Sequence, residues 1–398
     1  MGGARIGIFT NTLRAGGLQR GVLNLARELV ARGHRVELLL SSATGSMLRE
    51  VPPAVKVREL AESWPFAVRP LFALPRSAQA LAPAWLLGRQ PRALYSLGPL
   101  ARYLAQEPPD ALLATPTASA LTALFAAQLA VSSVRIVARE ANTLTAQLAQ
   151  RRQLHRAQVL PLVREWYPRA SGIVAVSQGV ADELARATGI ARERIAVIHN
   201  PLDVARIRAA AAEQPPEPWL TAPGAPPVIV SAGRLVAAKD FATLLRAFAL
   251  LRRERRARLV ILGAGPRKLE LWWLARRLGI TVDVRFAGHV ANPFSYMARA
   301  RVFALSSRYE GLANVLREAL VCGSPVVATD CPSGSAEALG YGAHGRLVPV
   351  GDPQKLAHAL AATLDERDTP SLSAARAASV TSEDVVSRYL ALLLGDRA

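Results

Sequence analysis

Residues 228–262, VIVSAGRLVAAKDFATLLRAFALLRRERRARLVIL, predict a strand, a helix and a second strand. Val228–Ala232 and Arg258–Leu262 are short apolar runs rich in residues that favour strands. Residues 241–252 between them carry apolar side chains at helical spacing. A strand, a crossing helix and a second strand form the repeating unit of a parallel sheet. The stretch therefore predicts an α/β fold.

The same alternation continues through the rest of the chain, so further strands and helices are expected on both sides of this unit. Expected strands are residues 5–10, 35–41, 111–115, 134–138, 172–176, 282–286, 302–306 and 325–328. Expected helices are residues 18–32, 119–130, 178–188, 266–278 and 312–322. A chain of 398 residues exceeds the ~250–300 at which one core stops growing, so we expect two domains. The proline-rich residues 213–227 mark the region of their junction.

Composition excludes several other classes of protein. A hydrophobic content of 51% with ordinary glycine and proline excludes a disordered chain or a fibre. Cys322 and Cys331 are too few for a disulfide framework and suit a reducing compartment. The apolar run at residues 6–9 is too short for a signal peptide. Residues 111–134 carry no charge, but Pro116 and interspersed hydroxyl groups favour a short strand and a helix over a membrane span.

The net charge of +19 comes almost entirely from arginine, since only four of the 49 basic residues are lysine. Such a composition is typical of a base-composition bias, and no nucleic-acid-binding motif accompanies it, so we expect no nucleic-acid partner. The excess is greatest in residues 63–106, where arginines alternate with aromatic residues and acids are absent. This pattern favours contact with an anionic membrane surface; a helical insertion with solvated arginines is the alternative. The residues concerned are Trp64, Phe66, Arg69, Phe72, Arg76, Trp85, Arg89, Arg92, Tyr95, Arg102 and Tyr103.

Two glutamates eight residues apart flank the start of the helix expected at 312–322. Glu310 precedes this helix and Glu318 lies two turns into it, so both can border one ligand. Gly311 lets a ligand approach the backbone, and helix N-termini attract anions such as a diphosphate. The amides concerned belong to Leu312, Ala313, Asn314 and Val315. Spacing alone would favour an ordinary amphipathic helix, so the interpretation depends on the neighbouring residues.

Cations and glycines follow two of the expected strands. Arg234 and Lys239 come shortly after the strand that ends before Gly233, and they can neutralise the charge on a departing nucleoside diphosphate. Two surface cations are the alternative. Gly16 and Gly17 lie in the first strand-to-helix loop and can bring backbone amides to the same phosphates, although such a pair is as common in simple turns.

Several stretches, in chain order, resemble the family 4 retaining glycosyltransferases. They are GGLQRGVLNLA (16–26), VAVSQGVADEL (174–184), VIHNPLD (197–203), SAGRLVAAKDFATLLRAF (231–248), LVILGAGP (259–266), FAGHVANPFSYMARARVFALSSRYEGLANVLREAL (286–320) and CGSPVVATDCPSG (322–334). That family has the GT-B fold, an α/β architecture of two Rossmann-like domains facing across a cleft. HVANPFSYM (289–297) and TDCPSG (329–334) are most similar to the subgroup that builds bacterial surface polysaccharides and lipid-linked oligosaccharides.

The resemblance implies a division of labour between the domains. Residues 1–203 would form the acceptor-side domain and residues 204–380 the donor-binding domain, with a helix in residues 381–398 packing back on the first. Glu310 would hold donor sugar hydroxyls, Glu318 the ribose, and Arg234 with Lys239 the diphosphate. The donor-binding set would also include Gly16, Gly17, Gly233, Val290, Asn292, Pro293, Gly311, Leu312, Ala313, Asn314 and Val315.

The same resemblance implies a reaction and its surroundings. A hexose or N-acetylhexosamine would pass from a nucleotide sugar, expected to be a UDP-sugar, to a lipid-linked or lipopolysaccharide glycan with retention of anomeric configuration. No cofactor or metal is expected, and the chain has no Asp-x-Asp motif. The enzyme would be cytoplasmic and peripheral at the inner face of the cell membrane. Alternatives are a GT-B transferase with a soluble acceptor, a sugar-nucleotide epimerase, and a non-catalytic scaffold of a glycan-assembly complex.

The sequence departs from the family pattern in two places. Many relatives carry a histidine where this chain has Arg139, Glu140 and, two residues on, Asn142. Glu140 is either an acceptor-side base or ligand, or a structural partner of Arg139; Arg139 and Asn142 are the other acceptor-side candidates. In addition, Ser335-Ala336-Glu337 replaces the more usual Pro-Arg-Glu, which leaves Glu337 in place.

Overall fold

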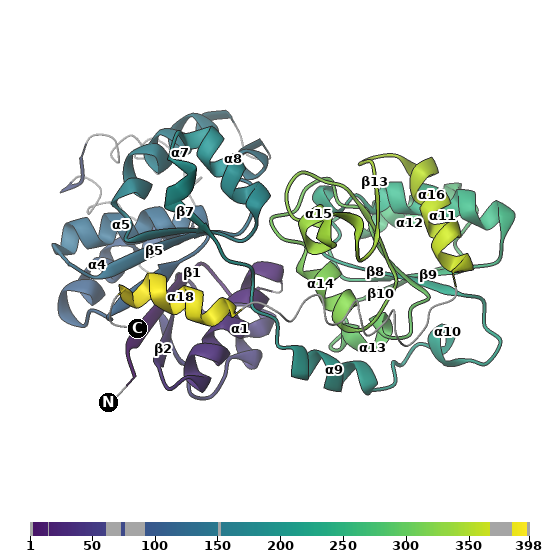
Figure 1. Ribbon diagram of the computed structural model, residues 1–398, viewed down its shortest axis with the longest axis horizontal. Helices are drawn as coiled ribbons and strands as arrows, with labels where there is room; N and C mark the ends of the chain where they lie inside the picture. The colour runs from purple at the N-terminus through teal and green to yellow at the C-terminus, as the bar shows by residue number, and fades with distance from the viewer. Residues whose placement is uncertain are drawn as a thin grey trace. The chain divides into compact units, whose positions relative to one another are not determined.

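The computed structural model describes residues 3–14, 16–60, 73–75, 92–149, 153–366 and 384–395. The chain divides into two compact units, Met1–Pro201 with Asp384–Ala398, and Leu202–Glu383. In the described ranges each unit is built on a parallel sheet with helices packed on it (Figure 1). Two Rossmann-like domains, as predicted from the sequence, are therefore present.

The first unit contains a seven-stranded sheet in the order β3-β2-β1-β4-β5-β6-β7. Its order reverses at β1, which pairs with β2 on one side and β4 on the other. In open α/β sheets, ligands bind beyond the carboxyl ends of the strands at such a reversal. The strands are β1 (Arg5–Thr10), β2 (Arg35–Leu40), β3 (Lys56–Glu59), β4 (Ala111–Ala114), β5 (Arg135–Glu140), β6 (Gly172–Ala175) and β7 (Ile195–Val197).

Helices from both ends of the chain cover this sheet. Residues Val22, Leu25 and Leu29 of the first helix share one apolar core with Tyr389 and Leu393 of the last. Figure 1 shows this last helix, in yellow, beside the strands of the first unit. The helices are α1 (Gly17–Ala31), α4 (Leu97–Gln106), α5 (Thr117–Ala130), α6 (Leu144–Ala149), α7 (Gln153–Trp166), α8 (Gln178–Thr188) and α18 (Val385–Leu394).

Polar contacts fasten α18 to the first unit. The Arg32 guanidinium lies 2.8 Å from Asp384, whose side chain caps the helix by accepting from the amide of Ser387. At the other end, Arg135 Nε donates to the carbonyl of Leu393 at 3.0 Å. The last helix is thus held at both ends as well as by its apolar face.

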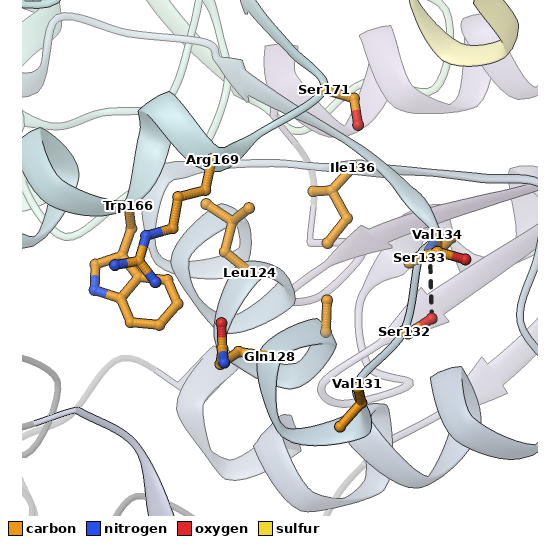
Figure 2. Close-up of a pocket in the computed structure, with 11 residues that line it drawn as sticks. Leu124, Gln128, Val131, Ser132, Ser133, Val134, Ile136, Trp166, Arg169 and Ser171 are labelled. Atoms are coloured by element: carbon orange, nitrogen blue, oxygen red, sulfur yellow. Dashed lines mark hydrogen bonds between the residues drawn. The ribbon is translucent and has the colours of Figure 1, made fainter.

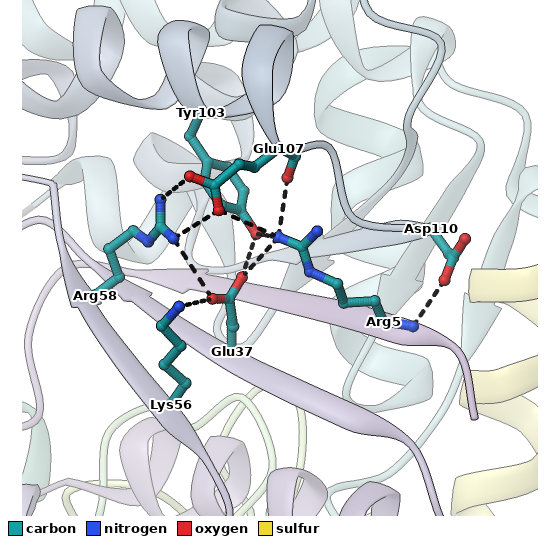
Figure 3. Close-up of polar contacts among 7 residues, drawn as sticks. All are labelled: Arg5, Glu37, Lys56, Arg58, Tyr103, Glu107 and Asp110. Atoms are coloured by element: carbon teal, nitrogen blue, oxygen red, sulfur yellow. Dashed lines mark hydrogen bonds and ion pairs between the residues drawn. The ribbon is translucent and has the colours of Figure 1, made fainter. Parts of the chain in front are cut away.

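A buried carboxylate joins β1, β2 and β3 to α4 (Figure 3). Glu37 accepts hydrogen bonds from the Tyr103 hydroxyl at 2.5 Å and from Arg5 at 3.3 Å. Lys56 and Arg58, from β3, lie 3.4 and 3.8 Å from the same carboxylate. Burial opposes ionisation of Glu37, but the hydrogen bonds from Tyr103 and Arg5 outweigh it and lower its pKa.

The second unit contains a six-stranded sheet in the order β10-β9-β8-β11-β12-β13. Here the order reverses at β8, which pairs with β9 and β11. The strands are β8 (Val228–Ala232), β9 (Arg258–Leu262), β10 (Val284–Gly288), β11 (Val302–Leu305), β12 (Val326–Thr329) and β13 (Arg346–Val348). The helices are α9 (Val204–Ala212), α10 (Pro218–Thr221), α11 (Phe241–Glu254), α12 (Lys268–Arg277), α13 (Pro293–Met297), α14 (Asn314–Val321), α15 (Ser335–Ala338) and α16 (Pro353–Asp365).

The strand–helix–strand unit that predicted the fold is confirmed. Strands β8 and β9 have the predicted bounds, and α11 continues two residues beyond its predicted end, to Glu254. The proline-rich residues 213–227 lie inside the second unit, and the two units divide earlier, at Pro201. Within this stretch Pro218 begins α10, and Glu217 caps it by accepting from the amide of Trp219.

Residues 111–130 form a short buried strand and a separate helix, as predicted. Strand β4 ends at Ala114, and α5 starts at Thr117 after Pro116. No helix in the described part of the chain combines the length and the apolar composition needed to cross a bilayer. Most of the basic and aromatic residues 63–106, including Trp64, Arg69 and Trp85, lie outside the described residues.

Candidate active site

The loop after β8 places Lys239 at the carboxyl end of the second sheet. Gly233 donates its amide to Leu262 at 2.9 Å, and Leu235 donates to Ala264 at 3.0 Å, so this loop is tied to the end of β9. The aliphatic part of Lys239 lies against Gly233, where an added Cβ would be 3.4 Å from Cε. The absence of a side chain at Gly233 therefore leaves room for the aliphatic part of Lys239.

The loop after the neighbouring strand β11 supplies Glu310. Lys239 Nζ donates to Glu310 Oε1, and Ser307 Oγ donates to the same oxygen at 2.7 Å. The side chains of Lys239 and Glu310 remain 20% and 12% exposed. An ammonium and a carboxylate that are partly open to solvent at the ends of adjacent strands can both reach a ligand there.

Backbone contacts hold these two loops together. Ser306 Oγ donates to the carbonyls of Lys239 and Asp240, each at 3.0 Å. Arg308 donates its amide to Ala238 at 2.8 Å and its side chain to Asp240 at 3.0 Å. The positions of the ammonium and the carboxylate are therefore set by the fold, which favours a preorganised site.

A third strand end supports the segment that begins with Glu310. Ser333, after β12, donates to the Glu310 carbonyl at 2.9 Å. Gly334 has a φ of +99°, and a Cβ at this position would lie 2.7 Å from the carbonyl oxygen of Gly311. Close packing of these two backbone segments therefore needs glycine at position 334.

Helix α14 starts directly after this segment. Among the described residues no side chain caps the helix at Ala313. Leu312, Ala313 and Asn314 are buried and Val315 is half-buried. Because amide groups at a helix N-terminus carry partial positive charge, this end of α14 can complement a phosphate.

Glu318 and its neighbour Arg317 are both buried in α14. Burial lowers the pKa of Arg317 to about 10, although the charges of Glu318 and Glu337 act in the opposite direction. Burial also raises the pKa of Cys322 to about 12, and Glu318 adds to that shift. Glu318, the fifth residue of α14, thus lies in a closely packed part of the helix.

Arg234 is exposed beside the site. Burial and the charge of Glu310 raise the pKa of Tyr309, and the charge of Arg234 partly offsets this, so Arg234 lies near the Tyr309–Glu310 segment. The described residues provide no ion-pair partner for Arg234. Its guanidinium is therefore open to an approaching anion.

The stretch predicted to meet the nucleobase is half-buried at Val290 and buried at Pro293. The side chain of Asn292 is used in packing, since its oxygen caps α13 through the amides of Phe294 and Ser295. Its nitrogen donates to the Ala210 carbonyl at 2.7 Å, which joins α13 to α9. Contact between these residues and a nucleobase stays a prediction.

The remaining predicted site residues belong to the first unit. Gly16 and Gly17 form the start of α1, after β1. Asn142 is half-buried in the turn before α6. Arg139 is buried at the end of β5, where it donates to the Tyr389 hydroxyl at 2.9 Å, to Thr115 at 3.3 Å and to Asn200.

Glu140, for which pairing with Arg139 was one of two alternatives, makes its hydrogen bonds to other residues. Glu140 is 0% exposed, and it accepts hydrogen bonds from the hydroxyls of Tyr167 and of Thr117, the latter at 2.9 Å. Successive side chains of a strand point to opposite faces, which separates the two neighbours. Burial raises the pKa of Glu140 to about 7, against the opposing effect of the hydrogen bonds from Tyr167 and Thr117.

A cavity of about 390 Å³ lies in the first unit, at the edge of the sheet where strand β5 begins. It opens beside the residues that precede and begin β5, including Ser133, Val134 and Ile136, and Arg169 stacks on Trp166 at its wall (Figure 2). Ligands of open α/β sheets bind at the carboxyl ends of strands, so we do not assign this cavity to the active site.

Sequence reasoning singled out the charged residues of the site and missed their hydroxyl partners. Ser307 and Ser333 each hold Glu310, one through its carboxylate and the other through its carbonyl. Both follow a strand of the second sheet, as Lys239 does. A hydroxyl in a loop that follows a strand was the signal that could have identified them.

Comparison with known proteins agrees with this architecture. Residues 15–206 match the family described as Glycosyltransferase Family 4, and residues 226–366 match the family described as Glycosyl transferases group 1. Both matches are to glycosyltransferase families, and together they span most of the chain. The resemblance predicted from the sequence is thereby confirmed.

Two curated relatives are similar over part of the chain. The N-acetylgalactosamine-N,N'-diacetylbacillosaminyl-diphospho-undecaprenol 4-alpha-N-acetylgalactosaminyltransferase of Campylobacter jejuni is 34% identical over 205 residues, 52% of this chain and 54% of the relative. The lipopolysaccharide core biosynthesis glycosyltransferase LpsE of Rhizobium meliloti is 37% identical over 141 residues, 35% of this chain and 40% of the relative. The chain thus matches about half or less of the length of these relatives.

A solved structure extends the likeness to the whole chain. Alr3699/HepE of Anabaena, in complex with UDP-glucose, matches with a TM-score of 0.74 at 19% identity and covers 98% of both chains. At this identity the likeness establishes the fold. The fold is GT-B, with two Rossmann-like domains.

Proposed function

We propose that this protein is a retaining glycosyltransferase that moves a hexose or N-acetylhexosamine from a UDP-sugar to a lipid-linked or lipopolysaccharide glycan. The observation that carries the proposal is the Lys239–Glu310 pair with exposed Arg234 beside it, at the carboxyl ends of β8 and β11. Two cations, a partly exposed carboxylate and a helix N-terminus match the chemistry of a nucleoside diphosphate sugar.

The relatives support each half of this proposal. The Anabaena protein was solved with UDP-glucose, which favours a uridine donor. The Campylobacter relative is named for an undecaprenol-diphosphate-linked acceptor, and the Rhizobium relative for lipopolysaccharide core synthesis. An acceptor that carries a glycan on a membrane lipid is common to both, so we extend this class to the present chain.

The residues suggest how the donor would be activated. Lys239 has three N–H groups and donates one to Glu310, so the other two can bind a phosphate oxygen. Arg234 would neutralise a second phosphate oxygen. These cations and the N-terminus of α14 would stabilise the charge on the departing diphosphate. Glu310 would hold hydroxyls of the donor sugar and Glu318 those of the ribose. In this mechanism no cofactor is needed.

The anomeric configuration is retained if the acceptor attacks the donor sugar on the same face from which the diphosphate leaves. The bond from the anomeric carbon to the phosphate oxygen breaks, and a bond to the acceptor oxygen forms. We assign the acceptor proton to a leaving phosphate oxygen, because Glu140 is closed off from solvent within its own unit. Glu140 would then position Tyr167 and Thr117 at the end of the first sheet.

A thermal-shift screen of nucleotide sugars tests the donor, since a bound ligand raises the apparent melting temperature by mass action. The stabilising donor, radiolabelled, is then incubated with a bacterial lipid extract, and the anomeric configuration of the lipid product is read by NMR. We expect an organic-soluble product of unchanged configuration with the wild type and none with Glu310→Gln. Glu254→Gln, an exposed glutamate of the same unit, is the matched control.

Each alternative has its own outcome in this experiment. Label confined to water-soluble glycans would indicate a soluble acceptor, and conversion of the donor without acceptor would indicate an epimerase. Donor binding without turnover would favour a scaffold. Equal turnover by Glu310→Gln and the wild type would contradict the assignment of the site.

A further inference from the structure

Helix α12 of the second unit exposes an apolar stripe to solvent. Leu269, Trp272 and Trp273 are 67%, 39% and 49% exposed, and their spacing of three and four residues places them on one face of the helix. Leu271 and Leu274 on the opposite face are buried in the core. The helix therefore packs inward with ordinary aliphatic residues and presents larger apolar ones outward.

This exposure is concentrated rather than scattered. Eight large apolar side chains are exposed among the described residues, and four of them belong to α12 and the loop that follows it: Leu269, Trp272, Trp273 and Val282. The other four, Val57, Val131, Tyr341 and Val350, lie at separate positions in the sequence. Clustered exposed apolar residues mark interaction surfaces, whereas single ones are normal.

Cations border the stripe. Arg276, one turn beyond Trp273, lies 5.9 and 5.5 Å from the ring centres of Trp272 and Trp273. Arg277 and Lys268 are exposed at the two ends of the helix. In the described structure no ion pair involves Arg276 or Arg277, whereas the acid of this helix, Glu270, is held by Arg267.

A second helix adds charge at the same edge of the sheet. Helices α11 and α12 each lead into the next parallel strand, so their carboxyl ends lie at the same edge. Arg253 and Arg256, at the end of α11, are exposed, as is Glu254 between them. The acid beyond α12, Asp283, is held by Arg252 at 2.8 Å. This edge of the sheet therefore carries a net positive charge.

We propose that this surface, Leu269, Trp272, Trp273, Arg276, Arg277 and Val282, binds the interface of an anionic lipid bilayer. Tryptophan suits that interface because its ring is apolar while its N–H can meet a headgroup. Arginine can extend its charge to lipid phosphates above inserted apolar side chains. Unpaired cations bordering the tryptophans complement an anionic membrane, and we therefore favour a bilayer over a protein partner.

The inference rests on the proposed function for its purpose, because a lipid-linked acceptor is presented at a bilayer. Membrane binding is nevertheless measured without turnover, so either proposal can fail while the other stands. Binding through one short helix would be shallow, and the basic residues near the surface would add to it.

Flotation of the full chain with lipid vesicles tests the surface. Vesicles of phosphatidylcholine with phosphatidylglycerol are compared with phosphatidylcholine alone, for the wild type, a Trp272→Ser/Trp273→Ser variant and an Arg276→Gln/Arg277→Gln variant. Tyr341→Ser, which removes an exposed aromatic residue elsewhere in the same unit, is the matched control. Unchanged melting temperatures confirm that the variants fold.

We expect the wild type and Tyr341→Ser to float with the anionic vesicles and to release as salt is added. The tryptophan variant should bind at least about tenfold more weakly, because two aromatic side chains no longer insert. The arginine variant should lose the preference for anionic lipid. Transfer to a short soluble acceptor in detergent should be unchanged in both.

Several results would overturn the proposal. One is equal flotation of the tryptophan variant and the wild type, which would assign membrane binding to another segment. Another is a wild type that binds neither kind of vesicle. A wild type that dimerises in solution through this surface, with the tryptophan variant monomeric by light scattering, would identify a second copy as the occupant instead.

Discussion

Lys239 and Glu310, 71 residues apart in sequence, form an ion pair at the carboxyl ends of two neighbouring strands. Each residue comes from a loop that the other loop holds in place, through Ser306 and the amide of Arg308. The pair neutralises both charges while leaving each side chain partly exposed. In the proposed function, the ammonium is thus already positioned to bind a donor diphosphate.

Removing the ammonium should affect catalysis far more than stability. We expect Lys239→Ala to lower transfer by roughly 10²–10³, the range found when one donor to a developing charge is removed. Lys239→Arg should recover part of this loss, because it keeps the charge but not the position. Steady-state kinetics provide the measurement, and the exposed Lys355→Ala is the control. Full activity in Lys239→Ala would show that another group holds the diphosphate.

Gly334 is expected to tolerate no side chain. Its φ of +99° strains any other residue, and a Cβ would collide with the Gly311 carbonyl at 2.7 Å. Gly351→Ala is a matched control, since its φ of +75° gives the same kind of strain with no atom within 4 Å. We expect Gly351→Ala to cost about 1 kcal/mol and Gly334→Ala roughly 1–3 kcal/mol more, with loss of transfer. Equal melting temperatures for the two variants would contradict the collision.

Glu140 should make folding stability fall as the pH rises. The pKa is about 7 in the folded chain and 4.5 in the unfolded chain, so between these values the folded chain keeps a proton that the unfolded chain releases. The free energy of unfolding should decrease by roughly 3 kcal/mol over this window, relative to Glu140→Gln. Chemical denaturation of both proteins from pH 4 to pH 8 measures the difference, with the exposed Glu193→Gln as control. Parallel pH profiles for Glu140→Gln and the wild type would rule out this titration.

Glu37 should have the opposite effect. Its pKa is lowered in the folded chain, so its contribution to stability is complete above the ordinary value of 4.5 and is lost as the pH falls through the lowered value. At neutral pH we expect Glu37→Gln to cost roughly 1–3 kcal/mol, since the buried Tyr103 and the neighbouring cations lose a charged acceptor. Glu107→Gln, whose side chain is half exposed, should cost less. Denaturation at pH 7 and at acid pH measures both, and a Glu107 effect as large as that of Glu37 would count against the central role of Glu37.

The sequence by itself determined the α/β class, most of the element order and the charged residues of the site. Strands β8 and β9 were predicted to the residue because apolar periodicity and strand-forming residues act over a few neighbouring positions. Lys239 and Glu310 were identifiable because each follows a predicted strand, and parallel strands end at the same edge of their sheet. The family resemblance was readable from local motifs for the same reason.

Only the tertiary structure decided where these elements meet. Strands β3, β7 and β13 are three or four residues long, and they are strands because a neighbouring strand pairs with them rather than because of a strong local pattern. The burial of Glu140, its partnership with Tyr167 and the outward face of α12 likewise depend on residues distant in sequence. Burial and hydrogen bonding of this kind are set by what the rest of the chain covers, and local periodicity does not contain that information.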